Sequence, residues 1–289
     1  MKLSVINTGY FKLDGGAMFG VVPKKLWSKT NPADQNNLCT WAMRSLLIEQ
    51  DNRLILIDTG IGNKQNDKFF SHYHLHGEDS LENSIHKAGY SLDEITDVFL
   101  THLHFDHCGG AVKWKNRENK ILEPVFKNAI YWSNENHWNW AEDPNPREKA
   151  SFLIHNISPI KESGQLKFID KNSQLTNNVF KNIDVFFADG HTESQMIPII
   201  NFNGQKIVFM ADLLPSVGHI PIPYVMGYDT RPLKTLAEKD FFLKLCQENN
   251  YLLFLQHDSV NECCTLKSTE KGIRLKSSYK LADFLLNAQ

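Results

Sequence analysis

The chain has 289 residues, of which 42% are hydrophobic and 22% charged, and its formal net charge is −2. This composition is usual for a folded protein with a buried core, in one large domain or two small ones. The absence of a Lys and Arg block argues against a nucleic acid partner. No stretch approaches the ~20 apolar residues that span a bilayer, so we expect no membrane partner.

The first ten residues and the cysteines indicate the compartment. The segment MKLSVINTGY holds one lysine and a short apolar run broken by Asn7 and Gly9, and it lacks a signal-peptide core. Five cysteines are scattered along the chain without a C-x-x-C motif, which is typical of reduced thiols. We therefore expect a cytoplasmic protein.

The first third of the chain predicts strands around one long irregular segment. Leu3–Asn7 is strand-like, and the apolar runs 46–48 and 54–57 flank a polar turn, which predicts a hairpin. The glycine-rich stretch 11–41 lies before them, and a loop of this length is uncommon unless it is functional. We expect it to form a lid or a subunit contact. A capped helix is predicted over Asp79–Gly89.

The rest of the chain alternates between the hydrophobic periodicity of strands and that of helices. Strand-like runs are expected at Ile95–Leu100, Ala129–Trp132, Ile183–Phe187, Lys206–Met210 and Tyr251–Gln256. Helices are expected at Glu135–Ala141, Arg147–Asn156, Thr235–Asn249 and Ser278–Asn287. Asn203-Gly204 predicts a tight hairpin turn. Periodicity alone therefore predicts a mixed α/β chain.

The segment THLHFDHCGG (Thr101–Gly110) concentrates potential metal ligands directly after one of these strands. In an extended segment, residues two apart project to the same side, so His102 and His104 can grip one ion together. Asp106 and His107 follow where the chain leaves the strand, and they are better placed to serve a second ion. This spacing predicts half of a metal centre.

Three further candidate ligands each follow an apolar run. His191 comes after Ile183–Phe187, Asp212 after Lys206–Ala211 and His257 after Tyr251–Gln256. Strand exits are where layered α/β proteins usually carry their site residues. Imidazole and carboxylate ligands without thiolate suit zinc, manganese, iron or cobalt ions used for hydrolysis.

This order of motifs resembles the metallo-β-lactamase superfamily, and Leu54–Gly60 (LILIDTG) is similar to the strand of that family that ends in D-T-G. The resemblance implies an α/β (α+β) fold of the four-layer αββα sandwich type, as a single domain over 1–289 with an inserted loop around 11–41. Asn145–Phe152 and 211–223 further resemble the branch that contains N-acyl-homoserine lactonases.

The resemblance also implies how the ligands divide between two divalent ions, expected to be zinc. His102, His104 and His191 would hold one ion, Asp106, His107 and His257 the other, and Asp212 would bridge them. A hydroxide shared by the ions would open the ring of an N-acyl-homoserine lactone, and Asp106 could protonate the leaving alkoxide. Asp58 would accept a hydrogen bond from a ligand imidazole.

The chain departs from the lactonase pattern at the group that polarises the substrate carbonyl. Lactonases of this family carry a tyrosine shortly after the bridging aspartate, whereas positions 213–215 are Leu-Leu-Pro here. His219, Tyr224 and Tyr228 are the candidates to replace it. The expected wall for the acyl chain lies in the 11–41 segment and consists of Met18, Phe19, Val21 and Trp27.

Several other functions share this ligand set. An organophosphate or aryl-ester hydrolase is the main alternative, because the same hydroxide attacks phosphorus or carbon. A thioesterase like glyoxalase II fits less well, since no basic tail for glutathione is present. The diiron oxidoreductases of the superfamily place a glutamate where this chain has His104. A homodimer formed through 11–41 is a further expectation.

Overall fold

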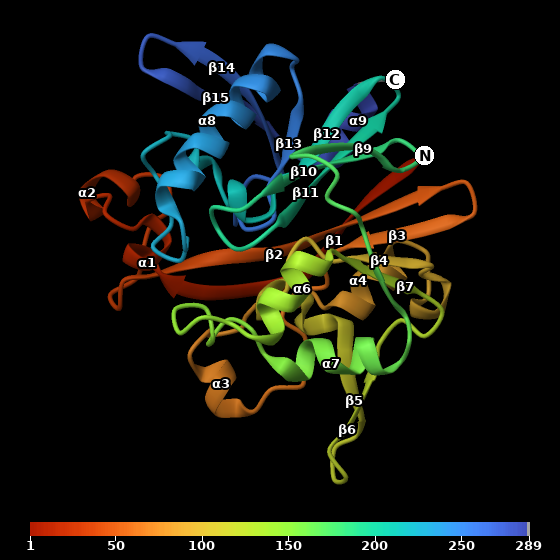
Figure 1. Cartoon of the computed structure of the whole chain (residues 1–289). Coiled ribbons are helices and arrows are strands. Elements are labelled where there is room, and N and C mark those ends of the chain that lie inside the picture. Colours follow the sequence, from red (N-terminus) through yellow and green to blue (C-terminus); the bar gives the residue numbers. More distant parts are fainter. Residues whose placement is uncertain (288–289) are drawn as a thin grey trace. The chain divides into compact units, whose positions relative to one another are not determined.

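The computed structural model describes residues 1–287. The chain forms two compact units. The first contains Met1–Tyr10 and Met43–Lys171, and the second contains Phe11–Ala42 and the chain from Asn172 onward. Each unit has a large sheet with helices beside it (Figure 1).

The main sheet of the first unit has the strand order β1-β2-β3-β4-β7-β8. The antiparallel hairpin predicted at the 50–53 turn is confirmed as β2 and β3, whereas β3, β4, β7 and β8 pair in parallel. The strands are β1 (Lys2–Asp14), β2 (Leu38–Gln50), β3 (Arg53–Ile57), β4 (Asp97–Phe99), β7 (Ile130–Ser133) and β8 (Leu166–Phe168), with a separate pair β5 (Val112–Asn116) and β6 (Ile121–Pro124). The end of β1 from Phe11 onward and the start of β2 up to Ala42 belong to the second unit.

The helices of the first unit cover an apolar core. Val98 of β4 and Tyr131 of β7 are fully buried, as expected for central parallel strands covered on both faces. The predicted helix at 79–89 is confirmed, with Ser80 as its N-cap. The helices are α3 (Asp67–Ser71), α4 (Leu81–Lys87), η1 (Leu92–Glu94), α5 (Phe105–Cys108), η2 (Gly109–Ala111), α6 (Glu135–Glu142) and α7 (Ile154–Glu162).

The sheet of the second unit has the order β15-β14-β13-β12-β11-β10-β9. Its pairs are antiparallel except β12 with β13. The Asn203-Gly204 turn between β11 and β12 is confirmed, and both residues have positive φ, of 52° and 83°. The strands are β9 (Leu175–Phe180), β10 (Ile183–Ala188), β11 (Gln195–Phe202), β12 (Gln205–Phe209), β13 (Leu252–Phe254), β14 (Cys263–Thr269) and β15 (Gly272–Tyr279).

The longest helix, α8 (Pro232–Glu248), packs on this sheet. Proline at its first position suits a helix start because the missing N–H has no partner there. Phe242, Leu243 and Cys246 are buried, and Phe242 stacks on Phe186 of β10 at 4.4 Å. The unit's other helices are α1 (Gly15–Phe19), α2 (Lys24–Trp27), η3 (Ala211–Leu213), η4 (Val217–His219) and α9 (Leu281–Asn287).

Two predicted helices begin later than expected. The helix expected at 147–156 begins instead at Ile154, because the Asn145 side chain accepts from the N–H groups of Arg147 and Glu148 and makes a turn there. The last helix begins at Leu281, since β15 continues to Tyr279.

The segment 11–41 is not irregular. It contains the end of β1, two short helices and the start of β2. Contacts inside the second unit hold it: Lys12 pairs with Asp34 at 2.8 Å, and Met18 O accepts from His219 Nε2 at 2.9 Å. The predicted roles as lid and as dimer contact stay predictions.

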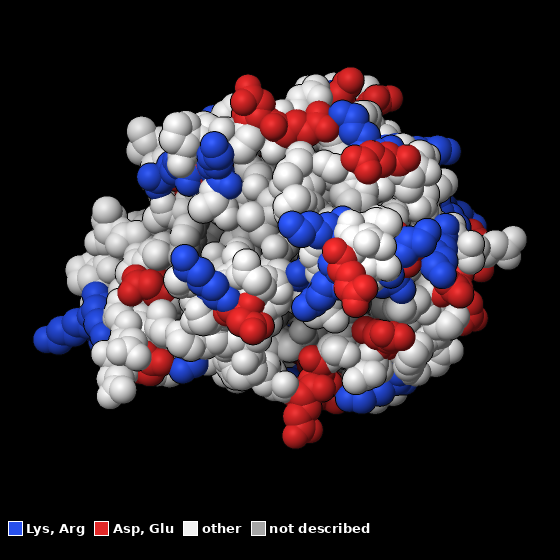
Figure 2. Space-filling model, turned by 90° about the horizontal axis from the view of Figure 1, so that it is seen from below, with Lys and Arg blue, Asp and Glu red and all other residues white. Residues whose placement is uncertain are grey.

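The surface carries both charge signs. Figure 2 shows lysine and arginine interspersed with aspartate and glutamate on the face drawn. All five cysteines are buried thiols. Among residues 1–287, no helix combines the length and the apolar character that crossing a bilayer requires.

Candidate metal centre

The first unit gathers its candidate ligands at the carboxyl ends of two parallel strands. β3 ends at Ile57, directly before Asp58, and β4 ends at Phe99, shortly before His102. Because parallel neighbours end at the same sheet edge, the D-T-G turn and the H-x-H-x-D-H segment meet there. Asp58 N donates to Phe99 O at 2.9 Å, which fastens one turn to the other.

Asp58 organises this edge. Its Oδ1 accepts from Thr101 N at 2.8 Å, and its Oδ2 accepts from Thr101 Oγ1 at 2.8 Å and from His107 Nδ1 at 2.9 Å. The hydrogen bond predicted between Asp58 and a candidate ligand is thus present. A proton held on Nδ1 of His107 makes Nε2 the metal-binding nitrogen. His102 Nδ1 lies 3.1 Å from Thr101 Oγ1, so the same group of residues orients a second imidazole.

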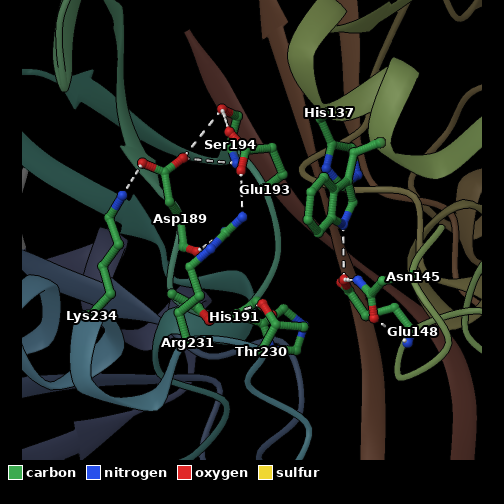
Figure 3. Close-up of polar contacts among 12 residues, drawn as sticks. His137, Asn145, Glu148, Asp189, His191, Glu193, Ser194, Thr230, Arg231 and Lys234 are labelled. Carbon is green, nitrogen blue, oxygen red and sulfur yellow. Dashed lines mark hydrogen bonds and ion pairs between the residues drawn. The ribbon is translucent and has the colours of Figure 1, made fainter. Parts of the chain in front are cut away.

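Two buried residues that the sequence analysis did not single out support the H-x-H turn. His137 Nε2 accepts from Leu103 N at 2.8 Å and so fixes the backbone between His102 and His104. Glu148 Oε1 lies 3.5 Å from His104 Nε2, while Glu148 Oε2 accepts from Asn145 Nδ2 at 2.6 Å. Figure 3 shows Glu148 beside Asn145.

The second unit presents its candidates in the same way, at the exits of β10, β12 and β13. These strands run in one direction, so His191, Asp212 and His257 emerge at one sheet edge. Asp212 lies between the two imidazoles, with Oδ2 3.1 Å from His191 Nε2 and Oδ1 3.0 Å from His257 Nε2. Two ligand atoms on one zinc ion, each about 2.0–2.1 Å from it, lie about 3.0–3.4 Å apart. The separations therefore fit one ion on each side of this carboxylate.

The outer nitrogens of both imidazoles have acceptors. His191 Nδ1 lies 2.8 Å from Asp229 Oδ1, and His257 Nδ1 lies 2.7 Å from Ala42 O. Both contacts place a proton on Nδ1 and turn Nε2 toward Asp212. This pairing of a metal ligand with an outer acceptor is usual at metal centres. The donor set of the second unit therefore fits metal ions.

The electrostatics agree with this fit. Burial disfavours a charge on His191, but Asp212 and Asp229 outweigh it and raise the pKa of His191 to about 10. Two carboxylates beside one buried imidazole make this position attractive to a cation. A divalent ion satisfies both carboxylates without a proton on Nε2.

The loop that carries His191 is clamped by charged side chains (Figure 3). Arg231 donates to Asp189 O at 2.7 Å and to Glu193 Oε2 at 2.8 Å, and Lys234 pairs with Asp189 Oδ2 at 2.7 Å. Residues 189–194 thus have contacts on both sides of the imidazole. Rigid support of this kind keeps a ligand in the geometry that an ion requires.

Gly190, next to His191, lies against Thr235 of α8. A Cβ at this position would lie 2.3 Å from Thr235 Oγ1 and 2.4 Å from Thr235 N, so Gly190→Ala must push the loop away from α8. It would also disturb the hydrogen bond from Gly190 N to Glu238 Oε2 at 2.9 Å. We expect a loss of about 1–3 kcal/mol of unfolding free energy, as for other overpacked sites, together with weaker metal binding.

Thermal unfolding and zinc titration of the apoprotein measure both effects. Gly164→Ala is the matched control, because nothing lies within 4 Å of its Cβ and its φ of +76° produces backbone strain alone. Equal zinc affinity in the Gly190→Ala protein and the wild type would contradict the expectation.

The residues predicted to contact substrate lie mostly in the core of the second unit. Met18, Phe19 and Trp27 are at most 2% exposed, whereas Val21 is 97% exposed. Phe19 stacks between Trp27 at 5.3 Å and His219 at 4.2 Å. Their predicted place in a substrate wall stays a prediction.

Of the candidates for polarising a carbonyl, His219 is buried and uses both ring nitrogens within the unit. Nε2 donates to Met18 O at 2.9 Å, and Nδ1 lies 2.8 Å from Ser216 Oγ. Burial is the main reason that the pKa of His219 falls to about 3, so the ring is neutral. Tyr224 and Asp212 line the same closely packed space, which has no room for a water molecule, and Tyr228 is 38% exposed.

A family model decides the classification. The model of the metallo-β-lactamase superfamily matches residues 44–257, which include every candidate ligand. The chain belongs to the metallo-β-lactamase superfamily. The family and the fold class predicted from the H-x-H-x-D-H motif are thereby confirmed.

Curated relatives within this superfamily are N-acyl homoserine lactonases. The lactonase AiiA of Bacillus thuringiensis subsp. kurstaki is 31% identical over 114 residues, which are 36% of this chain and 44% of AiiA. A Bacillus cereus N-acyl homoserine lactonase is 27% identical over 114 residues with the same coverage. The chain thus matches less than half the length of these relatives.

Solved structures of the metallo-β-lactamase fold match nearly the whole chain. A probable metal-dependent hydrolase from Staphylococcus aureus has a TM-score of 0.84 at 26% identity, covering 96% of this chain and 98% of that one. AidC, a dizinc quorum-quenching lactonase, has a TM-score of 0.76 at 24% identity, with 97% of each chain covered. The likeness to AidC shows the shared fold.

Proposed function

We propose that the chain holds two zinc ions with the ligands that its superfamily implies. The observation that carries this proposal is the Asp212 carboxylate, whose two oxygens face two imidazoles that are both fixed at Nδ1. All the proposed ligands are buried. As the superfamily implies, the proposed sets are His102, His104 and His191 for one ion, Asp106, His107 and His257 for the other, and Asp212 for both.

Two such ions, when bound, lower the pKa of a shared water toward about 7 and polarise a substrate carbonyl. The chain's own contribution is to hold the ligands. Asp58 keeps the proton of His107 on Nδ1, and Asp229 does the same for His191. Asp106, on α5, is the proposed proton donor to the leaving oxygen. The water-poor surroundings of these buried groups strengthen each interaction.

We further propose that the reaction is hydrolysis and that the substrate is an N-acyl-homoserine lactone, which would be opened to the N-acyl-homoserine. Support comes from the ligand set, which lacks the glutamate of the diiron branch, and from the similarity to curated lactonases. Tyr224 is the proposed group at the substrate carbonyl, because it packs in the same closely filled region as Asp212.

Proton release distinguishes this substrate from the main alternative. The purified, zinc-loaded protein is given short- and long-chain N-acyl-homoserine lactones in parallel with a paraoxon-type phosphotriester and an aryl ester. We expect acid release on the lactones well above the rate on the other substrates. Faster reaction with the phosphotriester would instead make the protein an organophosphate hydrolase, and inertness toward all substrates would refute the hydrolase proposal.

A further inference from the structure

Lys239, on α8, is a buried lysine whose ammonium group is fully engaged. The side chain is 1% exposed. Nζ donates to three backbone carbonyls: His219 O at 2.9 Å, Pro221 O at 3.1 Å and Tyr224 O at 2.7 Å. An ammonium has three N–H donors, and here each has one acceptor.

A buried ammonium needs a reason, because lysine is rarely removed from water unless it is paired. Burial lowers the pKa of Lys239 to about 7, while Asp229 acts in the opposite direction. For helix packing alone, an apolar side chain of similar length would serve as well or better. An apolar side chain would leave the three carbonyls without a hydrogen-bond donor. The lysine therefore holds in place the loop that supplies them.

That loop, the 219–231 segment, is fastened at both ends. Lys239 holds its first part. At the other end, Thr230 N donates to His191 O at 3.1 Å and Arg231 N donates to Gly190 O at 2.9 Å. Asp229, the acceptor for His191 Nδ1, lies in this fastened segment. The backbone that positions Asp229 therefore depends on the Lys239 contacts at one end and on the His191 loop at the other.

We propose that Lys239 is a positioning residue of the metal centre, acting through the 219–231 segment. It fixes where Asp229 meets His191 and where Tyr224 packs in the region that it shares with Asp212. The inference rests on the proposed function only in taking His191 as a metal ligand. Neither the substrate nor the hydrolytic activity enters it.

The test compares Lys239→Met with Lys244→Met in the full-length protein. Lys244 lies on the same helix, but its side chain is 56% exposed and pairs with Asp240. The apoproteins are titrated with zinc against a chromophoric chelator, and the cobalt forms are compared by visible absorption. Removal of an outer partner of a metal ligand typically costs 10–100-fold in affinity. We expect a loss of about that size for Lys239→Met, a shifted cobalt spectrum and faster amide hydrogen exchange over 219–231, with none of these changes in Lys244→Met.

Unchanged zinc affinity and an unchanged cobalt spectrum in Lys239→Met would overturn the proposal, even if its melting temperature falls, because packing alone predicts that pattern. If Lys239→Met does not fold, Lys239→Gln, which keeps two N–H donors, is judged by the same two measurements. A wild type that binds two zinc ions but opens no lactone would reject the proposed substrate and leave this inference standing. In that case, a loss of zinc affinity in Lys239→Met would still support the positioning role of Lys239.

Discussion

Replacement of Asp212 by asparagine is expected to reduce the bound zinc from two ions per chain to one or none. The carboxylate is the shared partner of His191 and His257, at 3.1 and 3.0 Å, and an amide of the same shape cannot bind two cations with two anionic oxygens. Loss of the metal contribution, several kcal/mol of barrier lowering, corresponds to a rate loss of about 10³-fold or more.

Elemental analysis of the dialysed Asp212→Asn protein and its rate of lactone opening measure both effects. Asp240→Asn is the matched control, because Asp240 lies in the same unit, is 45% exposed and pairs with Lys244 at the surface of α8. Two zinc ions and a near-normal rate in the Asp212→Asn protein would remove Asp212 from the centre.

The second large effect is expected for Asp58→Ala. Asp58 is fully buried and accepts three hydrogen bonds, two from Thr101 and one from His107. Truncation leaves these donors without their carboxylate, which costs about 3–5 kcal/mol where a buried charged partner is removed. It also releases the His107 tautomer, so zinc affinity should fall by about 10–100-fold.

Urea unfolding and zinc competition test this expectation together. Asp93→Ala, at an exposed position of the same unit, should change neither quantity. If Asp58→Ala unfolds like the wild type, the buried hydrogen bonds contribute far less than their geometry indicates. If it is destabilised but binds zinc normally, Asp58 stabilises the fold without orienting a ligand.

The candidate ligands could be predicted from the sequence because each follows an apolar strand. His102 follows β4, His191 follows β10 and His257 follows β13, so local periodicity marked their positions. The confirmed family supplied their grouping, which spacing alone leaves open.

The supporting residues could not be predicted in this way. Asp229 reaches His191 across 38 positions and follows no strand, and Glu148 lies in a turn that had the composition of a helix. Lys239 is a charged residue on a helix, which usually indicates a solvated face, yet tertiary contacts bury it. Such contacts depend on the folded geometry and leave no periodic signal.

The structure of the 11–41 segment likewise could not be predicted from its composition. Its glycines and aromatic residues predicted an irregular loop, but Gly15 lies where a Cβ would come within 2.3 Å of Trp27, and Gly20 adopts a φ of +59°. Gly15 permits close packing of two short helices, and Gly20 permits the turn after the first of them; composition alone does not distinguish these roles from flexibility.

The most direct test of the account is the number of metal ions that the intact protein holds. Apoprotein prepared by exhaustive chelation is titrated with zinc, and bound metal and lactone opening are followed together. The account predicts two tightly bound ions per chain, no activity without metal, and recovery as zinc is restored. Full activity of the metal-free protein, or saturation at one ion per chain with full activity, would contradict it.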